Sequence, residues 1–557
     1  MSELRLIPVA ALMWAATALV VLRMPFAATG VIVAAGVAAL CCRQPGQAIV
    51  LSCGGGVAAA TAWLRVRAVA ALGWGAPGTA SPGLVRGVVS EHPKQVREGF
   101  WLVTVDSTSY PVELPVMLRG DPPPAGAVVE AALQARPSER AGLLEYALSA
   151  RDMRVLAPPH GWQAATGYVR EVFAQACHYW LSEHAQGLVP GMVLGDVNMQ
   201  SDADRQLYMS TGLSHLTAVS GSNVAIVITA AFAVAKLLTL PPRVQVAAAG
   251  VSLAGFVGLV GCEPSVLRAG VTGMVGLLAV INSSKMQPMH GLALAVCTLV
   301  LWDSNLAVHY GFALSVAATA GIVVLQPLLV PALARLAIGG RRMPDVVVRA
   351  LGVAIAADVV TAPIIAMMTG SVPLVSVLAN MLVAPVVGVI TIVGLVAVCC
   401  ALLPGGLEAL PMMCIEPCAW WIHTVATVLA GPQLEAPAGW VVLGSLWVLY
   451  LFHRGYGRAV LGVALVGMAL WLLPRVHWWY GVKEVPLTQL SVVVEQKVEG
   501  DYEPPAGTQV VVVLDDQGAA RDRPTRTKGG IPVLYPNRDG EVALYSDGTQ
   551  HARDGRF

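Results

Sequence analysis

Long apolar runs alternate with short polar segments over most of the chain, and this pattern predicts membrane helices. Three apolar runs come first, at residues 7–22, 26–42 and 48–64, and a second block extends from about residue 213 to residue 474. A bilayer core of about 30 Å requires roughly 20 apolar residues per helix. We therefore expect about 13 crossings, three in the first block and ten in the second. The first run leads into another apolar run and not into a cleavage site, so we expect it to be retained.

Between the two blocks, the apolar residues alternate with polar ones. Short runs such as LVRGVVS, FWLVTVDS and YPVELPVMLRG lie between residues 81 and 157 and are separated by Gly and Pro clusters. This pattern predicts a small β domain, whose size suits a five-stranded, OB-like barrel. The residues that follow, 161–186, have apolar positions at helical spacing, which predicts an amphipathic helix that lies on the membrane surface or packs on the helix bundle.

After Pro474 the chain becomes polar, and two strand-like runs, at residues 490–494 and 510–514, are separated by Gly, Pro and Asp turns. They predict a small soluble module, either α/β or β, or the remnant of one. The fold class expected for the whole chain is a polytopic α-helical membrane protein with an inserted OB-like β domain outside the cytoplasm. The expected domains are N-terminal transmembrane helices at 1–66, the β domain at 76–158, the amphipathic helix at 161–186, the main membrane domain at 187–475 and the C-terminal module at 483–557.

The distribution of Lys and Arg between loops predicts the orientation. With a cytoplasmic N-terminus, three crossings place the β domain outside, and most cationic loops then fall inside. These loops contain Lys236, Arg243, Lys285, Arg335, Arg341, Arg342, Arg349, Arg454 and Arg458. The opposite loops, around Glu263, Asp303 and residues 431–437, are poor in cations, whereas Arg65 and Arg67 do not fit the pattern. The C-terminal module is expected outside as well.

The composition agrees with a membrane protein, since 56% of the 557 residues are hydrophobic and 12% are charged. The formal net charge of +1 excludes the global basic excess that is typical of nucleic-acid-binding proteins, so any contact with a polyanion must be local. Most cysteines lie inside apolar runs as small hydrophobic residues. Cys414 and Cys418 share a helix face, but the histidines and carboxylates near them in the sequence do not have the spacing of a zinc site. We therefore expect neither a metal ion nor a cofactor.

The stretch TGLSHLTAVSGSN, residues 211–223, places polar side chains at the head of an apolar run. On one helix, His215, Ser222 and Asn223 would share an arc with Ser220 beside it. Polar groups at membrane depth face a protein interior or a wet cavity. Gly221 also permits a break in the helix. The residues could line a translocation path or form hydrogen bonds between helices, and the pattern leaves both alternatives open.

Three more polar residues lie within the second membrane block. Arg268 stands near the head of a predicted helix at 265–280, where it could face a pathway or pair with Glu263. Asn380 together with Pro385 indicates an interrupted helix or a plain kink. Asp358 could pair with Arg268, couple protons or lie near an interface.

Four motifs in order resemble the ComEC family of bacterial competence proteins. They are the stretch LVPGMVLGDVNMQSDADRQLYMSTGLSHLTAVSGSNVAIV, then EPSVLRAGVTGMVGLLA, then Trp302-Asp303 with the GFALS sequence at 311–315, and VPLVSVLANMLVAPVVG. With the β domain, the resemblance covers about residues 10–474. It implies a channel that passes single-stranded DNA across the cytoplasmic membrane in natural transformation. In addition to the lipid bilayer, it implies two partners, an external DNA receptor and a cytoplasmic DNA translocase.

Long members of that family end in a metallo-β-lactamase-like nuclease domain. The tail after Val482 contains one histidine, His551, and lacks the cluster of His and Asp that such a metal site requires. We therefore expect a short form without enzymatic activity. On this interpretation, the translocation path is formed by His215, Ser220, Gly221, Ser222, Asn223, Arg268, Asp358 and Asn380.

The β domain offers its own candidates for contact with DNA. Its cations could contact phosphates and its aromatic rings could stack on bases. The cations are Arg86, Lys94, Arg97 and Arg119, and the aromatic residues are Trp101, Phe100 and Tyr110. Acidic residues are interspersed among them, so the sequence contains no basic stripe.

Two other functions fit parts of the pattern. An exporter or proton-coupled transporter of another solute would use the same wet cavity, with Asp358 as the proton-binding group. A membrane nuclease would require the tail to bind a metal ion, which the tail's composition argues against.

Overall fold

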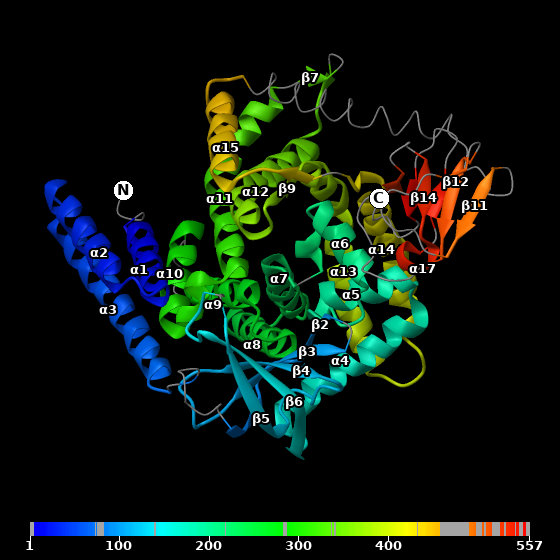
Figure 1. The fold of residues 1–557 in the computed structure, drawn as a ribbon. Coiled ribbons are helices and arrows are strands. Elements are labelled where there is room, and N and C mark those ends of the chain that lie inside the picture. Colours follow the sequence, from blue (N-terminus) through cyan, green and yellow to red (C-terminus); the bar gives the residue numbers. More distant parts are fainter. Residues whose placement is uncertain are drawn as a thin grey trace. The chain divides into compact units, whose positions relative to one another are not determined.

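The computed structural model describes the chain in two compact units, residues 1–454 and 455–557. In the first unit it describes residues 5–72, 74, 83–97, 99–138, 141–217, 219–281, 287–335, 337–338, 341–431 and 433–454. In the second it describes residues 455–456, 490–496, 504–505, 508–514, 524–527, 531–540, 542–544 and 550–552. Residues 457–489, which include the end of the predicted membrane block, lie outside the described residues. Figure 1 shows the order of the elements.

The first three apolar runs form helices α1 (Leu6–Val21), α2 (Pro25–Cys41) and α3 (Pro45–Ala70). Pro25 and Pro45 begin α2 and α3, where the lack of an N–H costs no hydrogen bond. Arg65 of α3 donates hydrogen bonds of 2.8 Å to the Trp302 carbonyl and to Ser304 Oγ. This cation, which does not fit the loop pattern, is therefore engaged by the second membrane block.

The predicted β region is present as strands β1 (Gly83–Val89), β2 (Lys94–Arg97), β3 (Phe100–Asp106), β4 (Leu114–Arg119), β5 (Val128–Pro137) and β6 (Tyr146–Ala157). Five of these strands close into a ring, in which β1 pairs with β5 and β3, and β4 pairs in parallel with β6. Alternate residues such as Val103, Val105 and Val116 fill the interior, which explains the period-2 pattern. Figure 1 shows this barrel beside α4 and α8.

The predicted amphipathic helix ends earlier than expected. Helix α4 covers Gly161–Trp180, Leu181 is extended, and a second helix, α5 (Glu183–Leu194), begins after Ser182. A serine readily flanks a helix start, which explains the new helix before the expected end at residue 186. Residues 187–194 of α5 are all buried, so α5 lies within the protein. Helix α6 (Asp202–Ser210) follows.

The second membrane block is mostly helical. It contains α7 (Gly221–Leu237), α8 (Pro242–Val260), α9 (Pro264–Ile281), α10 (Pro288–Trp302), α11 (Tyr310–Ala334), α12 (Asp345–Thr369), α13 (Ser376–Ala401), α14 (Ala409–Leu429) and α15 (Ala438–His453), with short 3-10 turns η2 (Ser214–Leu216) and η3 (Ser304–Val308). Short strands β7 (Ala337–Ile338) and β8 (Arg341–Arg342) join α11 to α12, and β9 (Ser371–Pro373) pairs with β10 (Gln433–Glu435). Helix α13 is continuous through Pro385, so the alternative of a broken segment is not observed.

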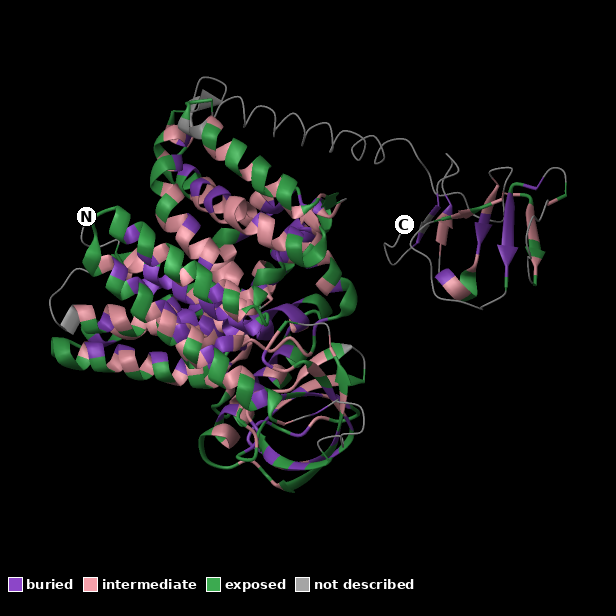
Figure 2. Cartoon of the chain, turned by 60° about the vertical axis from the view of Figure 1, so that its left-hand side comes forward, coloured by how far each residue is buried: buried purple, intermediate pink, exposed green. Residues whose placement is uncertain are grey.

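Seven helical segments among the described residues are long and apolar enough to cross a membrane, and five further apolar helices are shorter. The chain is thus a multi-pass membrane protein, while the count of about 13 crossings stays a prediction. Figure 2 shows buried residues inside the helix bundle and exposed residues on its outward faces. Large apolar side chains such as Phe26, Leu237 and Val251 are exposed there, as lipid contact requires.

The second unit contains a small mixed sheet. Strands β11 (Val492–Glu495), β12 (Val510–Val513) and β14 (Pro532–Leu534) pair in parallel, and β13 (Thr525–Arg526) is antiparallel to β14. A short helix, α17 (Pro536–Asp539), and a hairpin of β15 (Val542–Leu544) with β16 (Gln550–Ala552) complete it. Parallel pairing fits the α/β alternative for the tail.

Candidate functional site

The signature stretch at residues 211–223 does not form one helix, so the predicted shared arc of His215, Ser222 and Asn223 is wrong. His215 lies in the separate turn η2, Ser220 is extended, and α7 begins only at Gly221. Local hydrogen bonds by hydroxyl groups compete with helix formation here. Thr217 Oγ1 donates to the Ser214 carbonyl at 2.8 Å, and Ser220 Oγ donates to Asn223 Oδ1 at 3.0 Å.

Three glycines allow this stretch to lie directly against neighbouring helices. A Cβ on Gly191 of α5 would stand 2.5 Å from the Thr217 carbonyl oxygen. A Cβ on Gly212 would stand 2.5 Å from Ser376 Oγ of α13, and Gly212 also has a φ of +75°. A Cβ on Gly221 would stand 2.5 Å from Arg268 Nη2 of α9. The stretch is therefore packed between three helices at distances that only glycine permits.

Asn223 connects helices and is not free to face a path. It is 3% exposed, and its Nδ2 donates to the Met192 carbonyl at 2.7 Å. Its Oδ1 accepts hydrogen bonds from Ser220 Oγ and, at 3.3 Å, from Thr391 Oγ1 of α13. The buried amide is satisfied at both ends and joins α5, α7 and α13.

Arg268 is a buried cation that has no acidic partner among the residues that the structure describes. Its side chain is 8% exposed, and its Nε donates to Ser315 Oγ of α11 at 2.8 Å. No carboxylate within the described residues lies within 4.0 Å of it. The alternative pairing with Glu263 is wrong, because Glu263 pairs with Lys94 at 2.5 Å. The Arg268 guanidinium instead stands beside Gly221, at the positive N-terminal end of α7.

Three of the other predicted path residues, His215, Asp358 and Asn380, lie near Gly212 and its neighbour Ser376. Ser376 Oγ donates to Asp358 Oδ1 at 2.6 Å, and Asn380 Nδ2 donates to Ser376 Oγ at 3.3 Å. His215 is exposed, with its Nδ1 3.1 Å from the Gly212 carbonyl oxygen. The structure thus brings Asp358 and Asn380 together, and the predicted pairing of Asp358 with Arg268 does not occur. Ser220 and the exposed Ser222 lie at the other end of the stretch, with their hydroxyl oxygens 2.5 Å apart.

The candidate DNA contacts of the barrel are dispersed. Arg86 is exposed but faces Glu130 across β1 and β5, and Lys94 is engaged by Glu263. Trp101 is half-buried against the barrel core, as is Tyr110, which packs on Trp74. The Arg97 side chain lies outside the described residues. Arg119 and Phe100 remain as an exposed pair, with Arg119 Cζ 5.9 Å from the ring centroid.

The barrel contacts the helices through a polar junction that the sequence did not predict. Besides the Lys94–Glu263 pair, the Gln95 N–H donates to Asn198 Oδ1 at 3.0 Å. Arg170 of α4 is 7% exposed and donates to the Leu194 carbonyl at 2.6 Å. His92 lines the same recess. Its burial, together with the Arg170 guanidinium, lowers the pKa of His92 to about 4.

Acidification is expected to weaken this junction. The ordinary pKa of His92 is 6.5, so an unfolded chain binds a proton below that pH, whereas the folded chain does so only near pH 4. Stability should therefore fall as the pH drops from 6.5 towards 4, with a contribution from His92 on the order of 2 kcal/mol. The unfolding midpoint of the detergent-solubilised protein, followed between pH 7.5 and pH 4.5, measures this loss. His92→Gln should flatten the profile, whereas His178→Gln should leave it unchanged; equal profiles for all three proteins would contradict the assignment to His92.

Comparison with known proteins identifies the membrane domain. Residues 192–458 match the family model described as Competence protein. Neither the curated proteins nor the solved structures gave a match to the chain. The matched residues include the stretch at 211–223, Arg268, and the group formed by Asp358, Ser376 and Asn380. Residues 192–458 thus form a membrane region of the Competence protein family type.

Proposed function

We propose that the chain forms a channel for the uptake of single-stranded DNA across the cytoplasmic membrane in natural transformation. The proposal rests on Arg268, a buried guanidinium at the N-terminus of α7 with no described carboxylate within 4.0 Å. A cation beside the positive end of a helix favours an anion such as a phosphate group. The family match supports a role in competence.

The exposed polar groups around the same stretch would complete the wall of the path. Ser222 lies one residue from Gly221, and His215 lies three residues from Gly212. Both side chains are exposed, whereas Asn223 is engaged between helices. We assign contact with DNA to Arg268, Ser222 and His215, and a positioning role to Ser220, Gly221 and Asn223.

The barrel would receive the strand outside the cytoplasm. Its closed five-stranded ring, with one parallel pair, supports the OB-like interpretation, and OB folds bind single strands by stacking and by phosphate contacts. Phe100 and Arg119 offer one stacking surface and one cation side by side. Two contacts support this placement. Glu263 and Asn305 lie in loops that are predicted to be external, and both contact the β domain. Glu263 pairs with Lys94, and Asn305 Oδ1 accepts a hydrogen bond from the Leu143 N–H.

Deletion of the gene in a transformable source bacterium tests the channel. We expect loss of transformants and loss of nuclease-resistant labelled DNA from the cytoplasm, with DNA bound at the cell surface unchanged. Normal transformation of the deletion strain would refute the proposal. The passage of DNA requires no covalent chemistry, so we propose no enzymatic activity; metal-dependent cleavage of DNA by the purified chain would contradict that part.

The second candidate is a proton-coupled transporter or exporter of another solute. Asp358 favours it, since this carboxylate lies inside α12 and accepts a short hydrogen bond from Ser376. Reconstituted protein would then show solute flux in the absence of DNA, and Asp358→Asn would alter that flux. Flux that depends on DNA, or no flux of small solutes, would favour the channel.

A further inference from the structure

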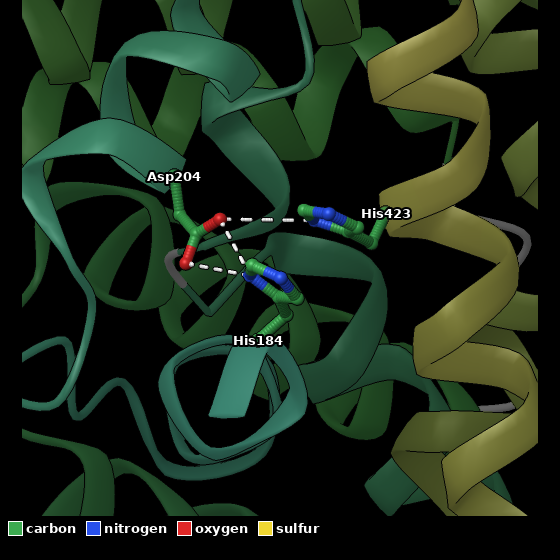
Figure 3. Close-up of side chains that lie close together, drawn as sticks. All are labelled: His184, Asp204 and His423. Atoms are coloured by element: carbon green, nitrogen blue, oxygen red, sulfur yellow. Dashed lines mark hydrogen bonds and ion pairs between the residues drawn. The ribbon is translucent and has the colours of Figure 1, made fainter. Parts of the chain in front are cut away.

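Two histidines and one aspartate from three helices meet away from the candidate path. His184 lies in the first turn of α5, Asp204 in the first turn of α6, and His423 in α14. Figure 3 shows the Asp204 carboxylate directed at both imidazole rings. His184 Nδ1 is 3.0 Å from Asp204 Oδ1, and His423 Nδ1 is 3.7 Å from the same oxygen. We propose that these three side chains bind one divalent transition-metal ion of the Zn²⁺ type.

The ligand atoms have the separations that such an ion requires. One ligand atom of each residue lies within 4.8 Å of the other two. Metal–ligand bonds of about 2.0–2.2 Å in tetrahedral geometry place ligand atoms about 3.3 Å apart. The two measured separations, 3.0 and 3.7 Å, lie on either side of that value. Imidazole and carboxylate ligands suit Zn²⁺ and related ions, and three protein ligands leave a fourth position for water.

Asp204 is held in place as metal-binding carboxylates usually are. Asp204 is 7% exposed, and Ser201 Oγ donates to its Oδ2 at 2.9 Å. His184 Nδ1 is 3.0 Å from Oδ1 and 3.3 Å from Oδ2, so Oδ1 is the closer of the two oxygens. Within the described residues, no Lys or Arg lies within 4.0 Å of this carboxylate. A buried carboxylate without a permanent cation is costly, and a metal ion would supply the missing charge.

The surroundings leave hydrogen-bonding groups unused. Among the described residues, His423 Nδ1 is buried without a hydrogen-bond partner, and so is the hydroxyl group of Tyr208, one turn after Asp204 on α6. Buried polar atoms are normally satisfied, so the unpaired His423 Nδ1, 3.7 Å from Asp204 Oδ1, indicates a missing ligand. The rings of His184 and His423 are stacked, with centroids 3.7 Å apart and planes at 15°. Binding would turn the rings so that a lone pair of each meets the ion.

The ion would connect α5 and α14 to α6, whose last residue, Ser210, directly precedes the stretch at 211–223. It would thereby fix the start of that stretch against the bundle. The inference depends on the geometry, burial and charge of these side chains, so it stands or fails independently of DNA transport.

Metal titration of the full chain tests the site. The protein is purified in detergent without a polyhistidine tag, treated with a chelator, and titrated with ZnCl₂ by calorimetry and with CoCl₂ by absorption spectroscopy. We expect one equivalent bound, a cobalt spectrum of nitrogen and oxygen ligation, and an unfolding midpoint raised by several degrees. His184→Gln, Asp204→Asn and His423→Gln should each weaken binding at least about a hundredfold, and Ser201→Ala by about ten- to a hundredfold.

Matched controls separate this site from the other histidines and cysteines. His178→Gln changes a histidine of α4 whose Nδ1 is 3.0 Å from Gln186 Oε1. C414S with C418S removes two free cysteines of α14, where Cys418 Sγ donates to the Cys414 carbonyl. Both proteins should bind one equivalent with unchanged affinity. The proposal is overturned if the wild-type chain binds no stoichiometric metal, if His423→Gln and Ser201→Ala bind as tightly as wild type, or if cobalt shows thiolate ligation.

Discussion

Replacement of Arg268 by glutamine is expected to reduce DNA uptake by about ten- to a hundredfold, while Arg268→Lys retains a substantial part. A hydrogen bond to a charged group contributes about 1.5–3 kcal/mol, and each 1.4 kcal/mol corresponds to a factor of ten. The loss should be at the upper end of this range because no other cation replaces Arg268 beside Gly221 among the described contacts. Uptake is measured as nuclease-resistant labelled DNA per unit of protein in the membrane.

The two variants distinguish contact with DNA from a structural role. Glutamine keeps a donor for Ser315 Oγ but removes the charge, whereas lysine keeps the charge and loses the planar group. If charge matters, lysine should exceed glutamine, and Arg243→Gln, an exposed residue of α8, should behave as wild type. Equal uptake by wild type and Arg268→Gln would contradict the phosphate contact. If neither variant is present in the membrane, Arg268 is required for folding and its contact with DNA is not supported.

The main features of the fold could be predicted because they depend on local periodicity. Apolar runs of helical length and the alternating runs at residues 81–157 each reflect how one element faces its surroundings. The end of α4 at Trp180 was missed because Ser182 flanks a new helix. The separation of the turn η2 from α7 was missed for a similar reason, since side-chain hydrogen bonds of Thr217 and Ser220 compete with the helix.

Partner choice across long sequence separations could not be predicted. Glu263 has Arg268 five residues away, yet it pairs with Lys94, 169 residues away, because the barrel contacts the helices at this point. The residues His184, Asp204 and His423 carry no short spacing motif, and only the packing of α14 against α5 and α6 brings them together. Sequence reasoning identified the polar residues of the membrane block, but it could not say which of them satisfy one another.

Gly191→Ala is expected to destabilise the protein by about 1–3 kcal/mol, although alanine usually stabilises a helix. The added Cβ would stand 2.5 Å from the carbonyl oxygen of Thr217, which is backbone and cannot rotate away. Either α5 or the stretch at 211–223 must shift, and DNA uptake should fall with stability because that stretch positions Ser222 and Arg268. The unfolding midpoint in detergent measures the first effect and nuclease-resistant DNA the second.

The matched control for this prediction is Gly388→Ala in α13. A Cβ on Gly388 meets no atom within 4 Å, so the same substitution in another membrane helix should be neutral or stabilising by up to about 1 kcal/mol. A second variant, Gly212→Ala, adds both a Cβ 2.5 Å from Ser376 Oγ and an unfavourable φ of +75°, and should also be destabilising. If Gly191→Ala, Gly212→Ala and Gly388→Ala all unfold at the wild-type temperature, residues 211–223 are not packed as tightly as these distances require. The positioning role assigned to Gly221 would then be contradicted as well.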